Sequence, residues 1–384
     1  MGATMPAEVA ENFLVFRDKL MLPSEGFIPA HYIAFDALSP VYVANQFGWR
    51  ADELSGRQIT TASSSISRFA FKQLGACINP VRFYDKAGRP PVLMHAHFGR
   101  GGAMALPLAR ALGIPLFVTF HGGDATKQTH NRRQLVPSIY QRRLAQMHDY
   151  VSAYLCVSNF VADRLQAQGF PSSKLQTHYI GIPLVKMAVP TARTVDSPLL
   201  FIGRFVEKKG IDTLLSAMRL VADSNPAIRL EVAGSGPLER QLRAQAVDMS
   251  GVTFLGWQTP DQLVSRLATC SAMIVPSQQA TNGDCEGLPT VVLEAIRAGV
   301  PVVATRHAGI PEVIVDDETG LLVSERDPAA LAAAILRHYT MGDAAQDLVS
   351  AGQKRLRADF DATRQSRRLQ QILLDVSVAD SFQP

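Results

Sequence analysis

Two carboxylates with seven residues between them mark the segment 285–305. Glu286 precedes a Gly-Leu-Pro run, and Glu294 lies within the apolar stretch that follows it. A carboxylate can accept hydrogen bonds from hydroxyl groups, and the free backbone N–H groups at a helix start favour an anion. A site that binds hydroxyl groups beside a phosphate would fit a nucleotide sugar. A simpler interpretation also fits, in which Glu286 is an acidic residue near a positive helix end and Glu294 a solvated helix position.

A histidine and two basic residues add further chemistry. His121 opens the sequence His-Gly-Gly-Asp, where it could bind a sugar hydroxyl, act near neutral pH, or serve only as a structural residue. Arg204 and Lys209 lie in a loop bounded by Gly203 and Gly210. Two cations there could neutralise a diphosphate, although basic residues in surface loops are often simply solvated.

The residues around the two carboxylates predict the elements that position them. The apolar run 272–275 is short, as a buried strand would be. Pro289 suits the first helical position, and Gly299 with Pro301 ends the helix before the β-branched run 300–304. The segment therefore predicts a βαβ unit of a parallel sheet, in which ligands bind at the carboxyl ends of the strands.

Similar short apolar runs recur along the chain and predict a doubly wound α/β architecture in two domains. Strands are expected at 41–44, 92–97, 114–120, 154–157, 199–202, 228–233, 252–256 and 320–323, with helices at 159–168, 211–223 and 328–338. Residues 13–22 fit a short helix or a strand, and no element is assigned to 55–70. Periodicity is lost before residue 198, so we expect domains at 1–185 and 198–360 joined by a linker at 186–197, and a last helix within 361–384.

Composition narrows the class of protein. The 384 residues are 47% hydrophobic and 19% charged, typical of a globular protein. No apolar run approaches the ~18 residues of a membrane span, and the first residues lack the pattern of a signal peptide, so we expect a cytoplasmic chain. A net charge of +4 gives no argument for nucleic acid. The four cysteines lack metal-ligand spacing and predict reduced thiols; they are Cys77, Cys156, Cys270 and Cys285.

A basic stretch from Lys127 to Arg143 contains no acidic residue. Its cations alternate with apolar residues, which suits contact with anionic lipid head groups or an acceptor's phosphate. A solvated basic helix fits equally. The cations are Lys127, His130, Arg132, Arg133, Arg142 and Arg143.

The motif around Glu286 resembles a known family. Glu286-x7-Glu294 lies in Glu-Gly-Leu-Pro-Thr-Val-Val-Leu-Glu-Ala and is followed by Gly-Val-Pro-Val-Val-Ala-Thr and, from Gly309, by Gly-Ile-Pro-Glu-Val-Ile. This long ordered match is similar to the donor site of retaining glycosyltransferases of family 4, which have the GT-B fold. It is closest to members that build bacterial exopolysaccharides and lipopolysaccharides. The segment at 24–28 departs from the family, because Gly26 replaces a usual Thr.

The resemblance implies two Rossmann-like domains facing each other across a cleft, with the donor held mainly by the second and the acceptor by the first. It implies that the last helix crosses back to the first domain and that Lys208 points outward. The catalytic residues would be His121, Arg204, Lys209 and Glu286. The donor-binding residues would be Gly203, Arg204, Lys209, Gly234, Gly256, Gln258, Glu286, Gly287, Leu288, Pro289 and Glu294.

Apart from the resemblance, three glycines before an expected helix could allow close approach to an anion, or could form a plain tight turn. This acceptor or phosphate loop would comprise Gly99, Arg100, Gly101 and Gly102.

The implied reaction is transfer of a hexosyl unit from a nucleotide diphosphate sugar to a hydroxyl of a glycan or polyprenyl-diphosphate-linked acceptor, with retention and with no metal or cofactor. Such an enzyme would work in cell-surface polysaccharide synthesis, in the cytoplasm or on the inner face of the membrane. Alternatives are another GT-B enzyme, such as an epimerase or a phosphorylase, and a non-catalytic sugar-nucleotide-binding protein. The sequence shows no context for the pyridoxal-bearing lysine of a phosphorylase.

Overall fold

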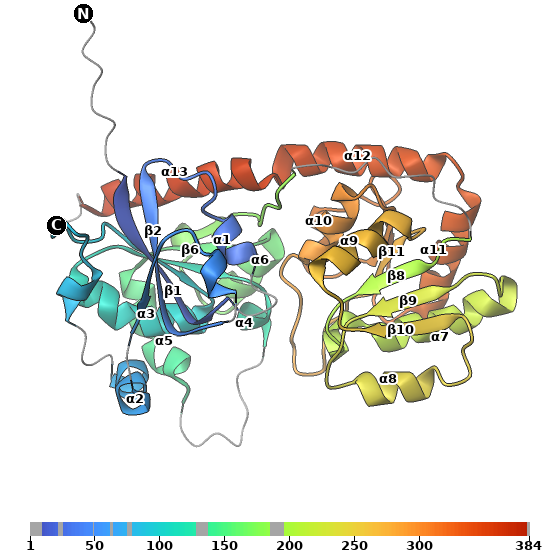
Figure 1. Ribbon diagram of the computed structural model, residues 1–384, viewed down its shortest axis with the longest axis horizontal. Helices are drawn as coiled ribbons and strands as arrows, with labels where there is room; N and C mark the ends of the chain where they lie inside the picture. Colours follow the sequence, from blue (N-terminus) through green and yellow to red (C-terminus); the bar gives the residue numbers. More distant parts are fainter. Residues whose placement is uncertain are drawn as a thin grey trace, which may run out of the picture.

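The computed structural model describes residues 10–21, 26–48, 50–61, 64–74, 79–127, 137–184 and 196–381. Ser24 and Glu25, His130 to Arg133 in the basic stretch, Cys77 and most of the expected linker lie outside these residues. The described chain forms two parallel sheets, each in its own domain, which lie next to each other in Figure 1. The predicted fold class is confirmed.

The sheet of the first domain has the order β3-β2-β1-β4-β5-β6-β7, and all its strand pairs in the described residues are parallel. Its centre is apolar on both faces, as expected for a sheet covered by helices on both sides. Residues 13–22 belong mostly to an interior strand of this sheet, where Phe13, Leu14, Val15 and Phe16 are fully buried. The strands are β1 (Glu11–Leu20), β2 (Leu38–Phe47), β3 (Arg57–Thr60), β4 (Met94–His97), β5 (Leu116–Phe120), β6 (Val151–Cys156) and β7 (Leu175–Thr177).

The helices of the first domain include one that the sequence left unassigned. Residues 55–70 contain β3 and most of α2 (Ser65–Leu74). The other α-helices are α1 (Phe27–Ala30), α3 (Gly99–Leu112), α4 (Gly123–Thr126), α5 (Ile139–Tyr150) and α6 (Asn159–Ala167). Short 3₁₀ turns are η1 (Ala51–Glu53), η2 (Pro80–Phe83) and η3 (Ser172–Lys174).

The second sheet has the order β10-β9-β8-β11-β12-β13, the order of a dinucleotide-binding fold. The order in which successive strands are added changes side between β8 and β11, which makes the carboxyl ends of these two parallel strands the expected ligand position. The strands are β8 (Leu199–Ile202), β9 (Leu230–Ala233), β10 (Val252–Gly256), β11 (Met273–Val275), β12 (Val302–Thr305) and β13 (Leu321–Val323).

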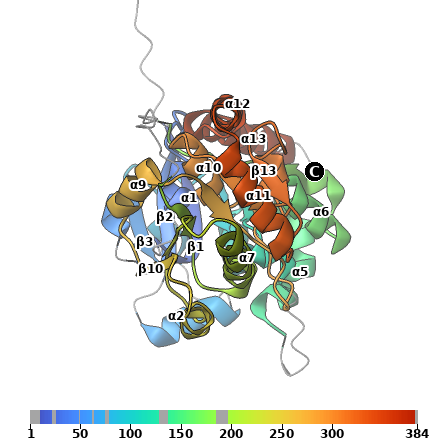
Figure 2. The same cartoon turned by 90° about the vertical axis from the view of Figure 1, so that its right-hand side faces the viewer.

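Helices cover both faces of this sheet, and α7 packs beside α11 (Figure 2). Gly299 ends α10 with a positive φ of 69°, which a glycine adopts without strain. The helices are α7 (Ile211–Ser224), α8 (Glu239–Gln245), α9 (Pro260–Thr269), α10 (Thr290–Arg297), α11 (Pro328–Thr340), α12 (Ala344–Asp359) and α13 (Ala362–Ser381). The 3₁₀ turns are η4 (Glu207–Lys209) and η5 (Ile310–Glu312).

The last two helices run across both domains (Figure 1). α12 packs on α10 of the second domain, whereas α13 lies on the first, where Leu369 and Leu373 join a core with Phe13 and Val15. Gln370 fixes this packing. Its Oε1 accepts the backbone N–H groups of residues 36, 37 and 38 at 3.0 to 3.2 Å, just where β2 begins.

A second link between the domains is made by Glu312 of η5. Its carboxylate accepts the N–H groups of Asn159 and Phe160 at the start of α6, at 2.8 and 3.0 Å, and the hydroxyl of Tyr179 at 3.0 Å. A negative charge at a helix start is stabilised by the free N–H groups and the helix dipole. Glu312 thus caps a helix of the opposite domain.

Candidate active site

Two loops from different domains meet at a pair of glycines. A Cβ on Gly287 would lie 2.3 Å from the carbonyl oxygen of His121, and a Cβ on Gly122 would lie 2.3 Å from the backbone nitrogen of Gly287. No side chain tolerates such distances, so only glycine permits this approach. His121 of the first domain and Glu286 of the second therefore lie on the two sides of one interdomain contact.

Glu286 is a buried carboxylate held by lysines. Lys209 Nζ lies 3.0 Å from its Oε1, and Lys208 Nζ lies 3.7 Å from its Oε2. Burial alone would raise the pKa of Glu286, but the two positive charges outweigh it and lower the pKa to about 2. The ion pair leaves Oε1 without an aligned hydrogen-bond donor among the described residues. Glu286 is therefore ionised, and its Oε1 can still accept a hydrogen bond from a hydroxyl group.

His307 fixes the backbone of Glu286. The N–H of Glu286 donates to His307 Nε2 at 3.1 Å, so the ring proton must be on Nδ1, which donates to Glu325 at 2.7 Å. His307 is buried and Glu325 is half-buried. Neither residue was identified from the sequence, where they lie 21 and 39 residues beyond Glu286 and match no short motif.

Lys208 corrects an expectation. Rather than pointing outward, its side chain is only 20% exposed and lies 3.3 Å from Asp284 and 3.2 Å from the carbonyl oxygen of Cys285. Burial lowers the pKa of Lys208, but the charges of Glu286 and Asp284 exceed that effect and raise it overall. The expectation was wrong because the partners of Lys208 are distant in sequence. The loop before α10 folds over η4 and supplies two carboxylates that no local pattern of 203–210 reveals.

We call Lys208, Lys209 and the carboxylates that they pair with, Asp284 and Glu286, the lysine cluster. This cluster extends across the domain contact. Lys127, the first residue of the basic stretch, pairs with Asp284 at 3.2 Å from the opposite domain. Nearby, the N–H of Cys285 donates to the hydroxyl of Thr126 at 2.9 Å. The end of α4 is thus attached to the loop that carries Glu286.

His121 is fixed on two sides. Its backbone N–H donates to Asp124 Oδ1 at 2.9 Å, and Asp124 Oδ2 accepts the N–H of Gly99 at 3.0 Å. Its ring lies between Phe27 and Phe98, at centroid distances of 4.8 and 4.5 Å, and its Nε2 is 3.0 Å from His97. Burial, with the nearby His and Arg charges, holds the pKa of His121 well below its usual range. The imidazole is therefore neutral.

Two family models match the chain in succession. Residues 47–186 match "Glycosyltransferase Family 4", and residues 186–355 match "Glycosyl transferases group 1". The chain belongs to this glycosyltransferase family. The boundary between the two matches falls at the expected linker.

Curated relatives of this glycosyltransferase include enzymes of bacterial polysaccharide synthesis. The putative colanic acid biosynthesis glycosyltransferase WcaL of Escherichia coli is 29% identical over 289 residues, which cover 72% of this chain and 69% of WcaL. The amylovoran biosynthesis glycosyltransferase AmsK of Erwinia amylovora is 29% identical over 285 residues, or 72% and 68% of the two chains.

Solved structures share the fold of the glycosyltransferase. Anabaena Alr3699/HepE in complex with UDP and glucose superposes with a TM-score of 0.74 at 14% identity, over 95% of this chain and 99% of HepE. Sucrose-phosphate synthase of Thermosynechococcus elongatus gives 0.73 at 19% identity, over 96% and 100%. Both likenesses show the GT-B arrangement.

Among the expected donor residues, the glycines have a common structural reason. A Cβ on Gly234 would lie 1.9 Å from the carbonyl oxygen of Gly203, so the ends of β8 and β9 approach closely. Gly256 adopts a positive φ of 70° at the end of β10. In the glycosyltransferase, Leu288 is buried and Pro289 is the N-cap of α10 rather than its first residue. The N–H groups of Gly287 and Leu288 have no acceptor within the described residues.

The other two charged candidates differ in their surroundings. Arg204 is exposed, and its guanidinium group makes no ion pair or hydrogen bond in the described part of the chain. Glu294 is partly buried. Burial raises its pKa despite the charges of Arg297 and Lys209. The charge of Lys209 thus reaches Glu294, while the side chain of Arg204 remains available to a ligand.

The loop 99–102 proves to be the first turn of α3. Packing explains two of its glycines, because a Cβ on Gly99 would lie 2.5 Å from the Phe120 ring and one on Gly102 would lie 2.7 Å from Val118. Gly101 faces open space and Arg100 is exposed. The amide of Gly99 is already bound by Asp124. A role for this turn in binding an acceptor or phosphate stays a prediction.

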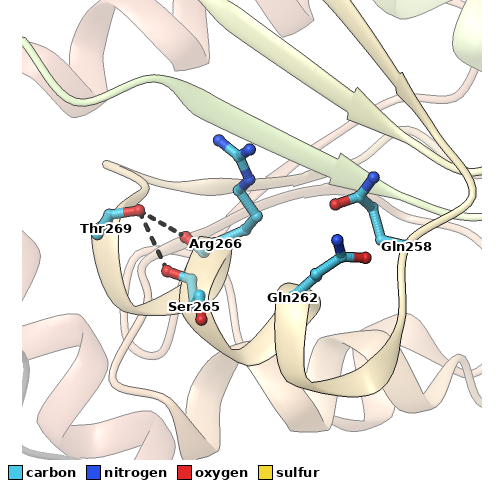
Figure 3. A pocket seen from close by; sticks show the side chains of 5 residues that line it. All are labelled: Gln258, Gln262, Ser265, Arg266 and Thr269. Carbon is cyan, nitrogen blue, oxygen red and sulfur yellow. Dashed lines mark hydrogen bonds between the residues drawn. The ribbon is translucent and has the colours of Figure 1, made fainter.

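Gln258 lies apart from the lysine cluster. Its amide donates to the carbonyl groups of Leu255 and Trp257, at 3.0 and 3.3 Å. Figure 3 shows its side chain at one end of a hollow along α9. The hollow is lined by Gln258, Gln262, Ser265, Arg266 and Thr269. No contact in the described residues joins Gln258 to Glu286 or Lys209, so a place for it beside the donor's base stays a prediction.

The described ranges contain no group of three or more His, Cys, Asp or Glu side chains that is arranged to hold a metal ion. No described helix combines the length and the apolar character that a membrane crossing requires.

Proposed function

We propose that this glycosyltransferase moves a hexosyl unit from a nucleotide diphosphate sugar to a hydroxyl of a glycan or lipid-linked acceptor, with retention and without a metal, in the synthesis of a cell-surface polysaccharide. The observation that carries the proposal is the ionised Glu286, held against Lys208 and Lys209 at the interdomain contact opposite His121.

The lysines and free amides suit a diphosphate leaving group. Negative charge grows on the phosphate oxygens as the sugar departs, and preorganised cations and N–H groups aimed at that charge supply the largest available stabilisation. Lys209, Lys208 and the N–H groups of Gly287 and Leu288 provide both kinds of group. A bound diphosphate would replace part of the pairing with Glu286 and free its carboxylate to accept the sugar's hydroxyls. The same cations support transfer without a metal.

The protonation states favour retention. An inverting enzyme needs a general base on the face opposite the leaving group. Glu286 and Asp284 are paired with lysines, Asp124 is engaged by two backbone amides, and the depressed pKa makes His121 a weak base. None of these groups is free to deprotonate an acceptor. The leaving phosphate oxygen can take that proton on its own side of the sugar, which gives retention.

The relatives support the donor and the biological role. WcaL and AmsK bear names of exopolysaccharide biosynthesis, and HepE binds UDP and glucose. We therefore expect a nucleotide sugar as donor and a growing glycan, free or carried on polyprenyl diphosphate, as acceptor.

Exposed apolar side chains of the first domain favour work at an anionic membrane. Ile66 and Phe69 of α2 and Val81 of η2 are 83%, 65% and 64% exposed. No acidic residue occurs between positions 54 and 84, where Arg68 and Arg82 accompany the apolar side chains. Exposed apolar groups with cations beside them match the surface of anionic lipids. The exposed apolar side chains carry the membrane proposal, because the arginines of this region all bond to oxygens of the chain; they are Arg68, Arg82, Arg142 and Arg143.

A donor panel tests the enzymatic proposal. The purified chain is incubated with UDP-, GDP- and ADP-sugars, with and without a glycan acceptor, in the presence of EDTA. We expect one of the donors to release its nucleoside diphosphate. NMR of the product should show the same anomeric configuration as in that donor. Inversion, dependence on added metal, or epimerised sugar nucleotide without transfer would each replace the corresponding part of the proposal. Tight binding without turnover of any donor would favour a non-catalytic protein.

A further inference from the structure

Histidines of the first domain form a buried group around His121. His95 and His97 alternate along β4, so their side chains share one face of the sheet. Their rings lie 4.6 Å apart, and the ring of His97 lies 5.3 Å from that of His121. His95, His97 and the neighbouring Tyr32 are at most 5% exposed. The sequence already shows the alternation, as His-Ala-His, but does not show what it contacts.

Four hydrogen bonds connect Thr119 to His121 through three side chains. Thr119 Oγ1 lies 2.6 Å from His95 Nε2, and His95 Nδ1 lies 2.9 Å from the Tyr32 hydroxyl. That hydroxyl lies 2.7 Å from His97 Nε2, and His97 Nδ1 lies 3.0 Å from His121 Nε2. We call these five residues the relay.

Every imidazole of the relay is neutral. Burial holds the pKa of His95, His97 and His121 well below the usual value, and the other histidines nearby lower it further. A neutral imidazole has one N–H and one lone pair, so each bond of the relay has a direction. Because the Tyr32 hydroxyl has a single proton, it donates to one histidine and accepts from the other. The directions of all four bonds are therefore coupled.

Only two arrangements satisfy all four bonds. In the first, Thr119 donates to His95, His95 to Tyr32, Tyr32 to His97, and His97 to His121, which leaves the proton of His121 on Nδ1. In the second, every bond is reversed and His121 carries its proton on Nε2.

The first arrangement leaves fewer buried groups unpaired. In the second, the fully buried hydroxyl of Thr119 would donate to nothing, because His95 is its only partner in the described structure. The lone pair on His121 Nδ1 would also lack a partner. In the first, the single unpaired donor is the Nδ1–H of His121. Leaving a buried donor unpaired costs stability, so the arrangement with fewer such groups is preferred.

We infer that the relay holds His121 as the Nδ1–H tautomer, so that this ring offers the transferred sugar a hydrogen-bond donor and selects a sugar with an oxygen acceptor at that position. Tyr32, His95 and His97 are then positioning residues. The inference rests on the proposed function for the identity of the ligand, but the tautomer itself does not. The Nδ1–H, which has no partner among the described residues, is the group that a sugar oxygen would pair.

The tautomer can be measured without any substrate. The full chain is labelled with ¹⁵N-histidine, and long-range ¹H–¹⁵N spectra distinguish a protonated ring nitrogen from an unprotonated one. The signals of His121 are assigned by their loss in His121→Gln. We expect a protonated Nδ1 and an unprotonated Nε2 in the wild type, and a mixture of both tautomers in Tyr32→Phe.

Kinetics on two pairs of variants complete the test. Tyr32→Phe should lower kcat/KM for the donor about 3- to 10-fold. One neutral hydrogen bond is lost, and a smaller fraction of the enzyme carries His121 as the Nδ1–H tautomer. Tyr154→Phe is the matched control, because Tyr154 is a buried tyrosine of the same domain whose hydroxyl has no partner among the described residues. His97→Asn, whose amide can still donate to His121, should retain more activity than His97→Leu.

The outcomes separate this inference from the proposed function. Three results would each overturn the relay. The first is a protonated Nε2 on His121, and the second is a Tyr32→Phe variant that equals Tyr154→Phe in spectrum and rate. The third is a His97→Asn variant that is no more active than His97→Leu. A wild type without activity on any sugar nucleotide would overturn the proposed function, and the spectra would still decide the tautomer. If Tyr32→Phe fails to fold, the His97 pair and the wild-type spectrum give the answer.

Discussion

Two adjacent lysines reach the same carboxylate. Lys208 and Lys209 belong to a single 3₁₀ turn, and both side chains lie near Glu286 because the loop before α10 covers that turn. An ionised carboxylate paired with two lysines is preorganised for exchange, since an arriving diphosphate meets cations that are already in position. Removing either cation should therefore act on the charge that develops in the transition state.

The first prediction concerns Lys209 and Glu294. Lys209→Ala should lower kcat by about 10²- to 10³-fold, because one preorganised donor to developing negative charge is lost. Glu294→Gln should mainly raise the donor KM, because we expect Glu294 to hold the ribose, which barely changes during reaction. Steady-state kinetics on folded variants measure both effects.

Exposed Lys354 of α12 provides the control, since Lys354→Ala should change neither constant. A Lys209→Ala enzyme with normal turnover and a raised KM would show that this cation only binds the donor. The case for transfer would then depend on Glu286 and the fold.

The second prediction concerns pH and stability. The pKa of Glu286 falls from 4.5 to about 2 on folding, so its ion pairs contribute fully above pH 4.5 and lose their contribution as the pH falls toward 2. The linked free energy is on the order of 3 kcal/mol. We expect Glu286→Gln to be less stable than the wild type at pH 6, with the difference shrinking as the pH is lowered from 5 to 3.5. Urea unfolding at several pH values measures it; a difference constant with pH would contradict the ionic assignment.

At the scale of elements, the strands of the sheets were the most predictable part. Short apolar runs such as 199–202 and 300–304 mark strands buried on both faces, and their order along the chain implies a parallel sheet. Residues 13–22 were ambiguous because Arg17, Asp18 and Lys19 interrupt the apolar pattern late in β1. Residues 55–70 were missed because β3 is an edge strand with a single buried residue, Ile59, and its polarity gives no strand signal.

The site was predictable only where one loop contains the whole pattern. Glu286 and Lys209 each lie in a motif of a single loop, and the structure brings them together. Lys208, Asp284 and His307 became apparent only in the fold, because their partners come from other loops or from the opposite domain. The sequence gives residue types within a loop but not which loops meet, and meeting depends on packing across two sheets.

The third prediction tests the contact between the two glycine loops. Gly287→Ala places a Cβ 2.3 Å from the His121 carbonyl oxygen, and the loops must separate to accommodate it. Overpacking of this kind typically costs about 1–3 kcal/mol, a shift of a few degrees in Tm for a chain of this size. Activity should fall far more than stability, by about 10²-fold, because a displacement of about 1 Å between reacting groups has that effect.

Gly26→Ala is the control, because its Cβ would have no neighbour nearer than 3.8 Å. Calorimetry and donor turnover are measured on both variants. If Gly287→Ala lost stability and activity in equal proportion, the contact would matter for folding rather than for positioning His121 against Glu286.

At the scale of the molecule, the proposed membrane contact lies on the first domain, which also provides His121. The fourth prediction is that the chain sediments with anionic liposomes and much less with neutral ones, because cations near an anionic surface contribute about 1 kcal/mol each. Replacing Ile66 and Phe69 by Asp should abolish this binding. Replacing Val247 and Val264, which are similarly exposed on the second domain, should not.

Donor hydrolysis in solution should be the same in all these variants. Equal binding to neutral and anionic vesicles, or equal loss in the two double variants, would remove the membrane role of α2.

The packing of α13 has a consequence for biosynthesis on the ribosome. This helix is translated after every other described element, yet Leu369, Leu373 and Gln370 complete the core beside β1 and the start of β2, which are translated among the first. While the chain is still being elongated, the first domain therefore lacks one wall and exposes Phe13 and Val15, with three backbone amides unpaired. The first domain therefore cannot complete its core until α13 has been synthesised, long after the ribosome has made the strands of its own sheet.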